Sequence, residues 1–500
     1  MERQRKKVLP VLKLNENMFF LKLLKNKVFF YTSSRYATYG LQFLNSLLIA
    51  KYLGVYYLGV WGFVMLVLQY LLRMNFGISN AANAIASIHK SDFKYVSQVI
   101  GVGVTLLCIL SFLISLFFLI ISFLSIDIGS KYLFGNFVPY VVMIAILNHF
   151  NLFFSNVFRV FGKLGAIVFN QTAQPLLMFF VIMFYKEEEL LLMLIKISLV
   201  ASLLSFLFYL LTSPVSFKPF VSWKLIKEVQ VKGIYLFIYN ACFYLIIITT
   251  RTFVGNYYSV NEFGYFTFAF TLASSVLLLF ESMSFLIFPK LLNRFSKGEN
   301  QKTIELLNFL RGSYITISHF SIHLIILFYP LLLLYFPVYN STIKVFSIIA
   351  LTAVIYINSF GYQELLIAKE KEKKISLVAF LALVLNIFLN YIFVIILKLN
   401  YEYIILATMI TYCIYIFVIC YLGRKLIHKE NSFKYTFLDV FPLKWMLPFI
   451  LSFVITIFYN EFNYLYLGPL ILFLSLNAKG IMQTWKLIKS IFKNSKIVDV

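Results

Sequence analysis

The sequence predicts an all-α polytopic membrane protein with about fourteen transmembrane helices. Of the 500 residues, 61% are hydrophobic and only 13% are charged, which is about half the charged fraction of an ordinary soluble protein. Apolar runs of about 20 residues, each long enough to cross the hydrocarbon core of a bilayer, recur along the whole chain. The alternating segments of about ten residues that characterise a membrane β-barrel do not occur in it.

Fourteen apolar segments, separated by short connections, have the composition of membrane spans. The last two are short and therefore the weakest. All connections are short, which argues against the large extracytoplasmic loops that membrane glycosyltransferases and polymerases use for sugar chemistry. The predicted spans cover residues 28–50, 58–84, 97–126, 137–158, 164–185, 190–212, 233–254, 264–289, 312–336, 345–367, 375–397, 403–423, 445–460 and 464–481.

The formal net charge of +24 follows this topology rather than a nucleic-acid surface. Most of the 44 lysine and arginine residues lie in the two ends of the chain and in alternate connections. By the positive-inside rule, both ends and these connections are cytoplasmic, and no nucleic-acid partner is expected. The four cysteines lie inside spans without metal-ligand spacing, so no metal site is predicted. The opposite connections contain only Lys51, Lys131, Lys186, Lys344 and Lys398.

Two stretches of the chain repeat each other at a separation of 205 residues. The segment 52–63 aligns with 257–268, and each connects the first two spans of a six-span unit. Because six is an even number, the second unit enters the membrane in the same orientation as the first, so the repeat is parallel about an axis along the membrane normal. The identical pairs are Tyr52/Tyr257, Val55/Val260, Gly59/Gly264 and Phe63/Phe268.

This repeat predicts two six-helix lobes with a cavity between them, followed by two extra C-terminal helices. The longer cytoplasmic connections are basic and amphipathic, and they are expected along the membrane surface. The predicted segments are a basic N-terminus (1–27), the first lobe (28–212), an interlobe linker (213–232), the second lobe (233–424), an amphipathic loop (425–444), the two extra helices (445–481) and a basic tail (482–500).

Several short motifs accompany this organisation: Lys25-Asn26 before the first span, the turn Tyr52–Phe63, Gly77 at the close of the second span, and Asn386-Ile-Phe-Leu-Asn390. With the span count and the repeat, they resemble Wzx-type polysaccharide and O-antigen flippases of the multidrug/oligosaccharidyl-lipid/polysaccharide exporter superfamily. In one departure, Tyr56-Tyr57 replace the acidic residue or proline usual in the family turn, although Glu262 is present in the second copy.

The resemblance implies movement of an undecaprenyl-diphosphate-linked oligosaccharide from the cytoplasmic to the periplasmic leaflet of the bacterial inner membrane. Two lobes would alternate between inward-open and outward-open states, coupled to an ion gradient such as Na⁺ or H⁺ or to the membrane potential. It implies no cofactor and no enzymatic activity. A polymerase and other polysaccharide-assembly proteins are further candidate partners.

Arginines inside predicted spans are the strongest candidates for a substrate site. A charged residue at the centre of a span costs about 2.5–3.5 kcal/mol even on an insertion scale. Arg35 lies seven residues into the first span and Arg73 fifteen residues after Leu58, so both are expected in the cytoplasmic half of the membrane. Their planar guanidinium groups match a diphosphate, although they can also snorkel to the interface or form structural ion pairs. Arg251, near the outer end of span seven, suits a release-side contact.

Two carboxylates inside spans of the second lobe are candidates for gating or ion coupling. Glu281 is predicted at a depth close to that of Arg73, and Glu364 near the cytoplasmic end of span ten. Glu281 can pair across the lobes with Arg35 or Arg73, or carry a coupling proton if burial raises its pKa. For Glu364 the alternative to such a role is a position at the cytoplasmic rim of the span. Polar side chains on several spans are candidates for sugar contacts, although interhelical hydrogen bonds explain such residues equally well. They include Gln42, Asn45, Asn80, Asn240, Asn386 and Asn390.

Three alternative functions remain from the sequence. A multidrug exporter of the same superfamily would favour a neutral or acidic cavity for cationic drugs, and the excess of arginine over glutamate within spans disfavours it. A membrane polymerase or glycosyltransferase is disfavoured by the short loops. A flippase for the peptidoglycan precursor differs from the leading hypothesis only in its substrate.

Overall fold

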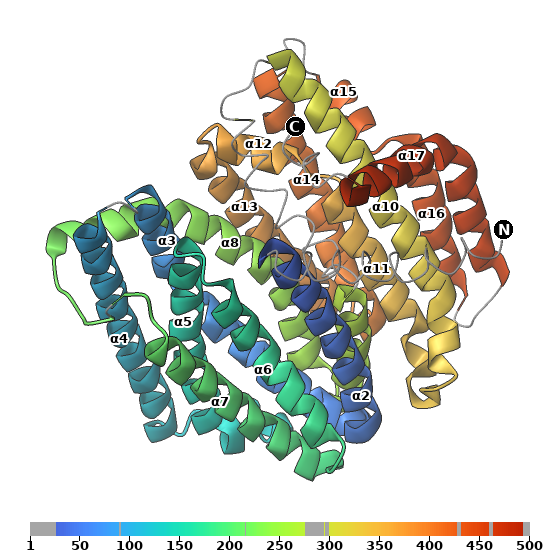
Figure 1. Ribbon diagram of the computed structural model, residues 1–500. Coiled ribbons are helices and arrows are strands. Elements are labelled where there is room, and N and C mark those ends of the chain that lie inside the picture. Colours follow the sequence, from blue (N-terminus) through green and yellow to red (C-terminus); the bar gives the residue numbers. More distant parts are fainter. Residues whose placement is uncertain are drawn as a thin grey trace, which may run out of the picture.

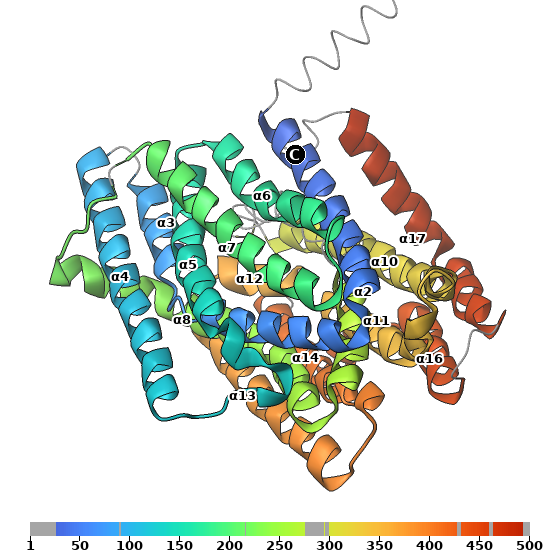
Figure 2. The same ribbon diagram turned by 90° about the horizontal axis from the view of Figure 1, so that it is seen from below.

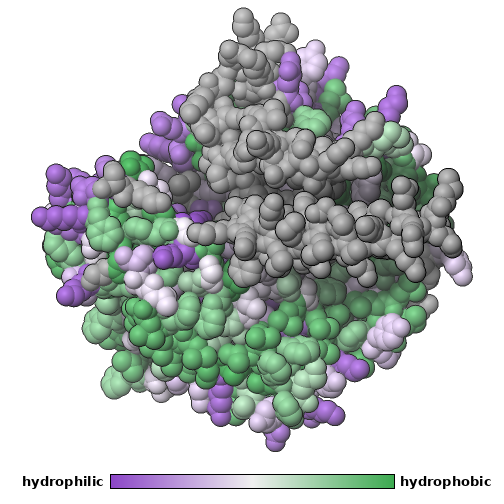
Figure 3. All heavy atoms as spheres, viewed as in Figure 1, coloured by the Kyte–Doolittle hydropathy of each residue, from purple (hydrophilic) through white to green (hydrophobic). Residues whose placement is uncertain are grey.

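The computed structural model describes residues 27–89, 92–215, 217–275, 295, 300–427, 432–459 and 464–493, and every regular element in these ranges is a helix. Eleven of the described helices are long and apolar enough to cross a membrane, or up to twelve if one bent pair counts as a single span. The predicted all-α, multi-pass membrane fold is therefore confirmed. Figure 3 shows hydrophobic side chains over a broad area, with hydrophilic ones gathered toward the rims.

The helices form two lobes and a C-terminal pair (Figure 1). The first lobe contains α2 (Lys27–Arg73), α3 (Ile78–Ile88), α4 (Phe93–Phe123), η1 (Ser130–Tyr132), η2 (Phe134–Phe137), α5 (Val138–Val160), α6 (Leu164–Ile182) and α7 (Glu187–Leu211). The second contains α8 (Trp223–Tyr257), a helix at 260–275, α10 (Asn300–Leu333), η3 (Pro337–Thr342), α11 (Ile343–Ile357), α12 (Tyr362–Ala368), α13 (Glu372–Tyr391), η4 (Ile392–Ile396), η5 (Tyr401–Tyr403) and α14 (Ile405–Ile427). The chain continues through α15 (Phe433–Val440), α16 (Leu443–Phe458), η6 (Tyr464–Tyr466) and α17 (Leu467–Lys493).

The first two predicted spans lie in one assigned helix that is broken in its middle. A straight helix of the 47 residues of α2 would extend about 70 Å, more than twice the thickness of a hydrocarbon core. Gly54 interrupts it with φ 69° and ψ 176°, a conformation open to glycine and costly for other residues. Figure 2 shows the two halves of α2 running in different directions. The break therefore makes α2 two spans.

Two other predicted spans differ from the structure in their continuity. The span predicted at 58–84 divides where α2 ends at Arg73 and α3 begins after Gly77, which has φ 74°. The span predicted at 345–367 divides before Gly361, which has φ 89°, into α11 and α12. The helices α15 and α16 meet at a bend of 63°. Only residues 260–275 of the eighth predicted span are described, and its remainder, with Glu281, lies outside the described residues.

The two copies of the repeat contact each other reciprocally across the lobes. A Cβ added to Gly59 would lie 2.2 Å from the carbonyl oxygen of Val260, and one added to Gly264 would lie 2.2 Å from the carbonyl oxygen of Val55. The two glycines are one aligned pair of the repeat and the two valines are another. Such reciprocity is what a two-fold relation between the lobes produces, and it requires that no side chain separates the backbones. We call this junction (residues 50–59, 130–132, 255–264 and 337–342) the closed end.

An acidic residue anchors α15 in the predicted amphipathic loop. Asp439 forms ion pairs with Arg311 of α10 at 2.9 Å and with Arg424 of α14 at 3.1 Å. The hydroxyl of Tyr362 donates to the same carboxylate at 2.6 Å. The guanidinium of Arg311 also donates to the carbonyl oxygens of Asn358 at 2.7 Å and Phe360 at 3.1 Å. It thereby satisfies backbone acceptors that the break between α11 and α12 leaves without helical donors.

Candidate functional site

A cavity of about 750 Å³ lies between the two lobes. Its size is within the range of ligand-binding pockets. It begins beside the closed end, where Gly62 and Thr267 line it, and extends along α11 to the break that precedes α12. Among the described residues, its wall combines aromatic rings, amides, hydroxyls and two charged groups. The first lobe supplies Gln42, Ser46, Trp61, Met65 and Gln69, and the second supplies Tyr244, Arg251, Phe270, Thr271, Tyr356, Gln363, Glu364 and others.

Arg251 is the cation of this wall. Its side chain is only 3% exposed, and its guanidinium carbon lies 4.7 Å from the ring centre of Phe270. Nη1 donates to the side-chain oxygen of Gln69 at 2.9 Å and Nη2 donates to the carbonyl oxygen of Gly62 at 3.4 Å. Its Nε has no hydrogen-bond partner, and within the described part of the chain no carboxylate contacts it. A buried guanidinium in this state attracts an anion.

Arg73 lies beyond Arg251 on the side away from the closed end. Its guanidinium carbon is 3.4 Å from the ring centre of Tyr244, and Tyr244 lines the cavity. The stacked ring holds the half-buried guanidinium at the margin of the cavity by a cation–π interaction. Arg73 and Arg251 are thus brought close to the same aromatic residue, from opposite lobes.

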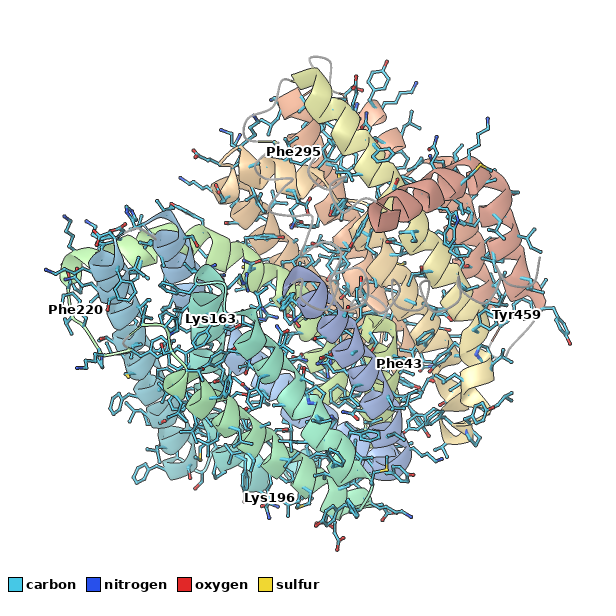
Figure 4. The ribbon with its side chains drawn as sticks, in the orientation of Figure 1. Phe43, Lys163, Lys196, Phe220, Phe295 and Tyr459 are labelled. Carbon is cyan, nitrogen blue, oxygen red and sulfur yellow. The ribbon has the colours of Figure 1, made fainter. Side chains whose placement is uncertain are left out.

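Arg35 occupies a different place from the one its predicted partnership with Arg73 requires. It donates to the hydroxyl of Tyr39 on the same helix and lies 4.9 Å from the centre of that ring. Its charged neighbour is Arg159 of α5, and neither residue lines the cavity. The break at Gly54 explains the difference, because it turns the half of α2 that carries Arg35 away from the half that carries Arg73. In Figure 4, Lys196 of α7 likewise lies at the edge of the first lobe, away from the cavity.

Glu364 is the acidic group of the cavity wall, at the end remote from the closed end. It is the third residue of α12, and its carboxylate accepts the N–H of Gly361 at 2.6 Å. Beside it, Gln363 donates to the hydroxyl of Tyr239 and accepts from that of Tyr356 at 3.3 Å. A carboxyl group in this setting can exchange a proton with the cavity.

Of the amide side chains predicted to contact sugars, Gln42 lines the cavity and the others do not. Asn45 is buried between helices, where its Nδ2 donates to the carbonyl oxygen of Pro175 at 2.7 Å. Asn80 of α3 and Asn240 of α8 are exposed on their helices. The predicted cavity position of these three residues is therefore wrong: Asn45 lies between helices, and Asn80 and Asn240 lie on the surface.

Asn386 and Asn390 also differ from the expected cavity position. Both are buried between α13 and α14, where Asn386 donates to the hydroxyl oxygens of Thr408 and Thr411 at 3.3 Å. Asn390 donates to the carbonyl oxygen of Asn386 at 2.8 Å. Buried amides on adjacent membrane helices stabilise helix packing in this way. Their role within the second lobe is therefore structural.

Several cavity residues escaped the sequence reasoning. Gln69 is an uncharged amide and Tyr244 is one of 34 tyrosines, so neither differs in kind from many residues outside the cavity. The one available signal was position, because Gln69 lies four residues before Arg73 on the same helical face. No group of three or more potential metal ligands occurs among the described residues.

The sequence matches no protein-family model and no curated protein, whereas the fold has clear relatives among solved structures. A structure described as "Lipid II flippase MurJ, inward closed conformation" is similar over 94% of this chain and 99% of its own, with a TM-score of 0.67 and 17% identity. An inward-facing multidrug resistance MATE family transporter of the MOP superfamily is similar over 79% and 98%, with a TM-score of 0.64 and 14% identity. This chain therefore has the fold that these transporters share.

Proposed function

We propose that this protein is a flippase that moves an undecaprenyl-diphosphate-linked oligosaccharide from the cytoplasmic to the periplasmic leaflet of the bacterial inner membrane. The observation that carries the proposal is the buried guanidinium of Arg251, which lines an interlobe cavity with an unpartnered Nε. A diphosphate supplies the negative charge and the acceptors that this group lacks. The similar structure of a lipid II flippase supports the same class of substrate.

The remaining cavity residues fit the other parts of such a substrate. Arg73 at the margin provides an earlier contact for the diphosphate, and Arg251 a later one nearer the closed end. The amides of Gln42 and Gln69 and the ring of Trp61 offer hydrogen bonds and an apolar face for sugars. The polyprenyl chain requires no polar partner and can remain in the bilayer.

Export of cationic drugs is the second candidate, because Glu364 gives the same cavity one acidic group. An experiment on a deletion strain distinguishes drug export from transport of the lipid-linked oligosaccharide. In a deletion strain, lipid-linked oligosaccharide is expected to accumulate on the cytoplasmic face, and the intact gene is expected to relieve this accumulation. Accumulation on the periplasmic face would instead indicate a polymerase. New sensitivity to cationic dyes without accumulation of the lipid-linked oligosaccharide would indicate drug export.

For ion coupling, we propose that Glu364 carries a proton. Its carboxyl group lines the cavity wall and accepts the N–H of Gly361, so it is placed to take up a proton from the cavity and to release it there. Transport by the parent protein in proteoliposomes is expected to accelerate under an imposed pH gradient, and transport by the Glu364→Gln variant is expected to lose this response. Glu372→Gln, at the start of α13 and outside the cavity lining, is the matched control. A full pH response in Glu364→Gln, or a response to Na⁺ alone, would contradict proton coupling through Glu364.

A further inference from the structure

A tyrosine from the first lobe reaches across the closed end to the second lobe. Tyr132 of η1 stacks on Phe63 of its own lobe, with ring centres 4.3 Å apart and planes within 6°. Its hydroxyl donates to the carbonyl oxygen of Gly255 in the second lobe at 2.6 Å. Gly255 is in the last turn of α8 (Trp223–Tyr257), where carbonyl groups have no helical donor. The interlobe bond therefore satisfies an acceptor that the helix itself leaves open.

The second lobe repeats this arrangement toward the first. Tyr339 of η3 stacks on Phe268, with ring centres 4.0 Å apart and an interplanar angle of 22°. Its hydroxyl donates at 2.8 Å to the carbonyl oxygen of Ala50, which lies just before the break of α2 at Gly54. Phe63 and Phe268 are an aligned pair of the repeat, and Ala50 and Gly255 have the same separation in sequence. The two tyrosine bonds are therefore related by the symmetry of the lobes.

The two lobes pack closely in the region between these bonds. A Cβ on Gly62 would lie 2.3 Å from the hydroxyl oxygen of Thr267, in addition to the reciprocal contacts of Gly59 and Gly264. A void of about 50 Å³, lined in part by Ser46, Ala50 and Thr267, lies between the cavity and the closed end. The lobes are therefore in direct contact at this end, and a substrate can leave here only if they separate.

We propose that Tyr132 and Tyr339 are paired latches of an outer gate, and that both interlobe hydrogen bonds must break for the substrate to leave toward the periplasm. Each tyrosine ring stacks on a phenylalanine of its own lobe. The ring is therefore expected to stay with that lobe when the interlobe hydrogen bond of its hydroxyl breaks. Opening the gate thus requires the loss of the two tyrosine bonds, of the Lys131 bonds described below and of a set of small-residue contacts. Among the described residues of the closed end, no buried ion pair has to separate. Hydrogen bonds and small-residue contacts cost less free energy to break than a buried ion pair, so they suit an interface that opens in every transport cycle.

The two latches are unequal, because Lys131 reinforces one of them. Its Nζ donates to the carbonyl oxygens of Asn256 at 2.9 Å and Tyr258 at 2.8 Å, beside the acceptor of Tyr132. A cation at a helix C-terminus is favourable, and these bonds persist when the hydroxyl of Tyr132 is removed. Among the described residues, no lysine or arginine donates to the carbonyl oxygens next to Ala50, so nothing comparable remains when the hydroxyl of Tyr339 is removed. Tyr339→Phe should therefore open the gate more than Tyr132→Phe.

The test measures access to the cavity from each side of the membrane. Ser46→Cys, in a background whose four native cysteines are alanine, places a thiol on the cavity side of the closed end. A membrane-impermeant maleimide is added to the periplasmic side of right-side-out vesicles and, separately, to inverted vesicles. We expect Tyr132→Phe and Tyr339→Phe each to accelerate periplasmic labelling by about two- to tenfold, the size expected for one hydrogen bond, and the double variant by about the product.

Tyr362→Phe is the matched control, since it removes a tyrosine hydroxyl bond that stays within the second lobe and its attached α15. Its labelling rate should equal that of the parent. An unchanged periplasmic rate in a correctly folded double variant, or an acceleration in inverted vesicles instead, would overturn the proposal. Labelling needs no substrate, so this test is independent of the proposed function. Unchanged labelling would contradict the gate even if lipid-linked oligosaccharide is transported. Accelerated labelling would support the gate even if the protein transports a different substrate.

Discussion

Replacing Arg251 by glutamine is expected to reduce transport of the lipid-linked oligosaccharide by roughly 30-fold or more. Removing one partner of a buried, hydrogen-bonded charge pair costs about 2–5 kcal/mol, and the guanidinium of Arg251 is the buried cation of the cavity wall. Glutamine retains hydrogen-bonding capacity but has no charge for the diphosphate. The measurement is the rate at which the variant, reconstituted in proteoliposomes, moves a fluorescent undecaprenyl-diphosphate oligosaccharide between leaflets.

Two further variants separate substrate binding from interlobe contact, because Arg251 also bonds to Gln69 and to the Gly62 carbonyl oxygen of the first lobe. Arg251→Lys keeps the charge but not the planar fork, and it should retain part of the activity. Gln69→Ala removes one interlobe bond and leaves the charge in place, so its loss should be small. If Gln69→Ala and Arg251→Gln lost transport equally, the interlobe bond rather than the anion would explain the role of Arg251.

The sequence identified the charged residues inside spans, but it did not show which of them lie at the same cavity. An arginine inside a span is costly wherever it faces, so Arg35, Arg73 and Arg251 were recognisable from their positions alone. Their grouping depended on geometry that hydropathy does not contain. The break at Gly54 separates Arg35 from Arg73, and the packing of α8 against α2 brings Arg251 toward Arg73 through Tyr244. Neutral partners such as Gln69 were invisible because the spans contain many similar residues.

The fold was more accessible from sequence than the site. Chain-wide hydropathy and the repeat predicted the helical lobes, and the aligned glycines Gly59 and Gly264 are where the two copies meet. The internal breaks were missed because an apolar window runs over them without a change in mean hydropathy. Gly77 and Gly361 have positive φ values of 74° and 89°, and a glycine inside a span is compatible with both continuous and broken helices. Only the tertiary contacts decide between them.

The second large effect is expected at Asp439, which lies far from the closed end. Asp439→Ala leaves the guanidinium of Arg311, only 4% exposed, without its carboxylate in the protein interior. Breaking a buried ion pair by removing one partner costs about 3–5 kcal/mol, because the remaining charge stays desolvated. We therefore expect a loss of that size in the free energy of unfolding, measured in detergent micelles by chemical denaturation. The variant Arg311→Met with Asp439→Leu removes both charges, and it should recover only part of the loss because the carbonyl oxygens of Asn358 and Phe360 then lack their donor.

Arg424→Gln is the matched control for this prediction, because Arg424 pairs with the same carboxylate from a more exposed position. Its loss should be smaller than that of Asp439→Ala, because the side chain of Arg424 is 14% exposed whereas that of Arg311 is 4% exposed. Equal losses in Asp439→Ala and Arg424→Gln would contradict the view that burial of Arg311 sets the size of the effect. The consequence extends to the cavity, since Arg311 also binds the carbonyl oxygens of Asn358 and Phe360. These groups form the break that leads into α12, so an Arg311 that moves to reach water would release the segment that positions Glu364.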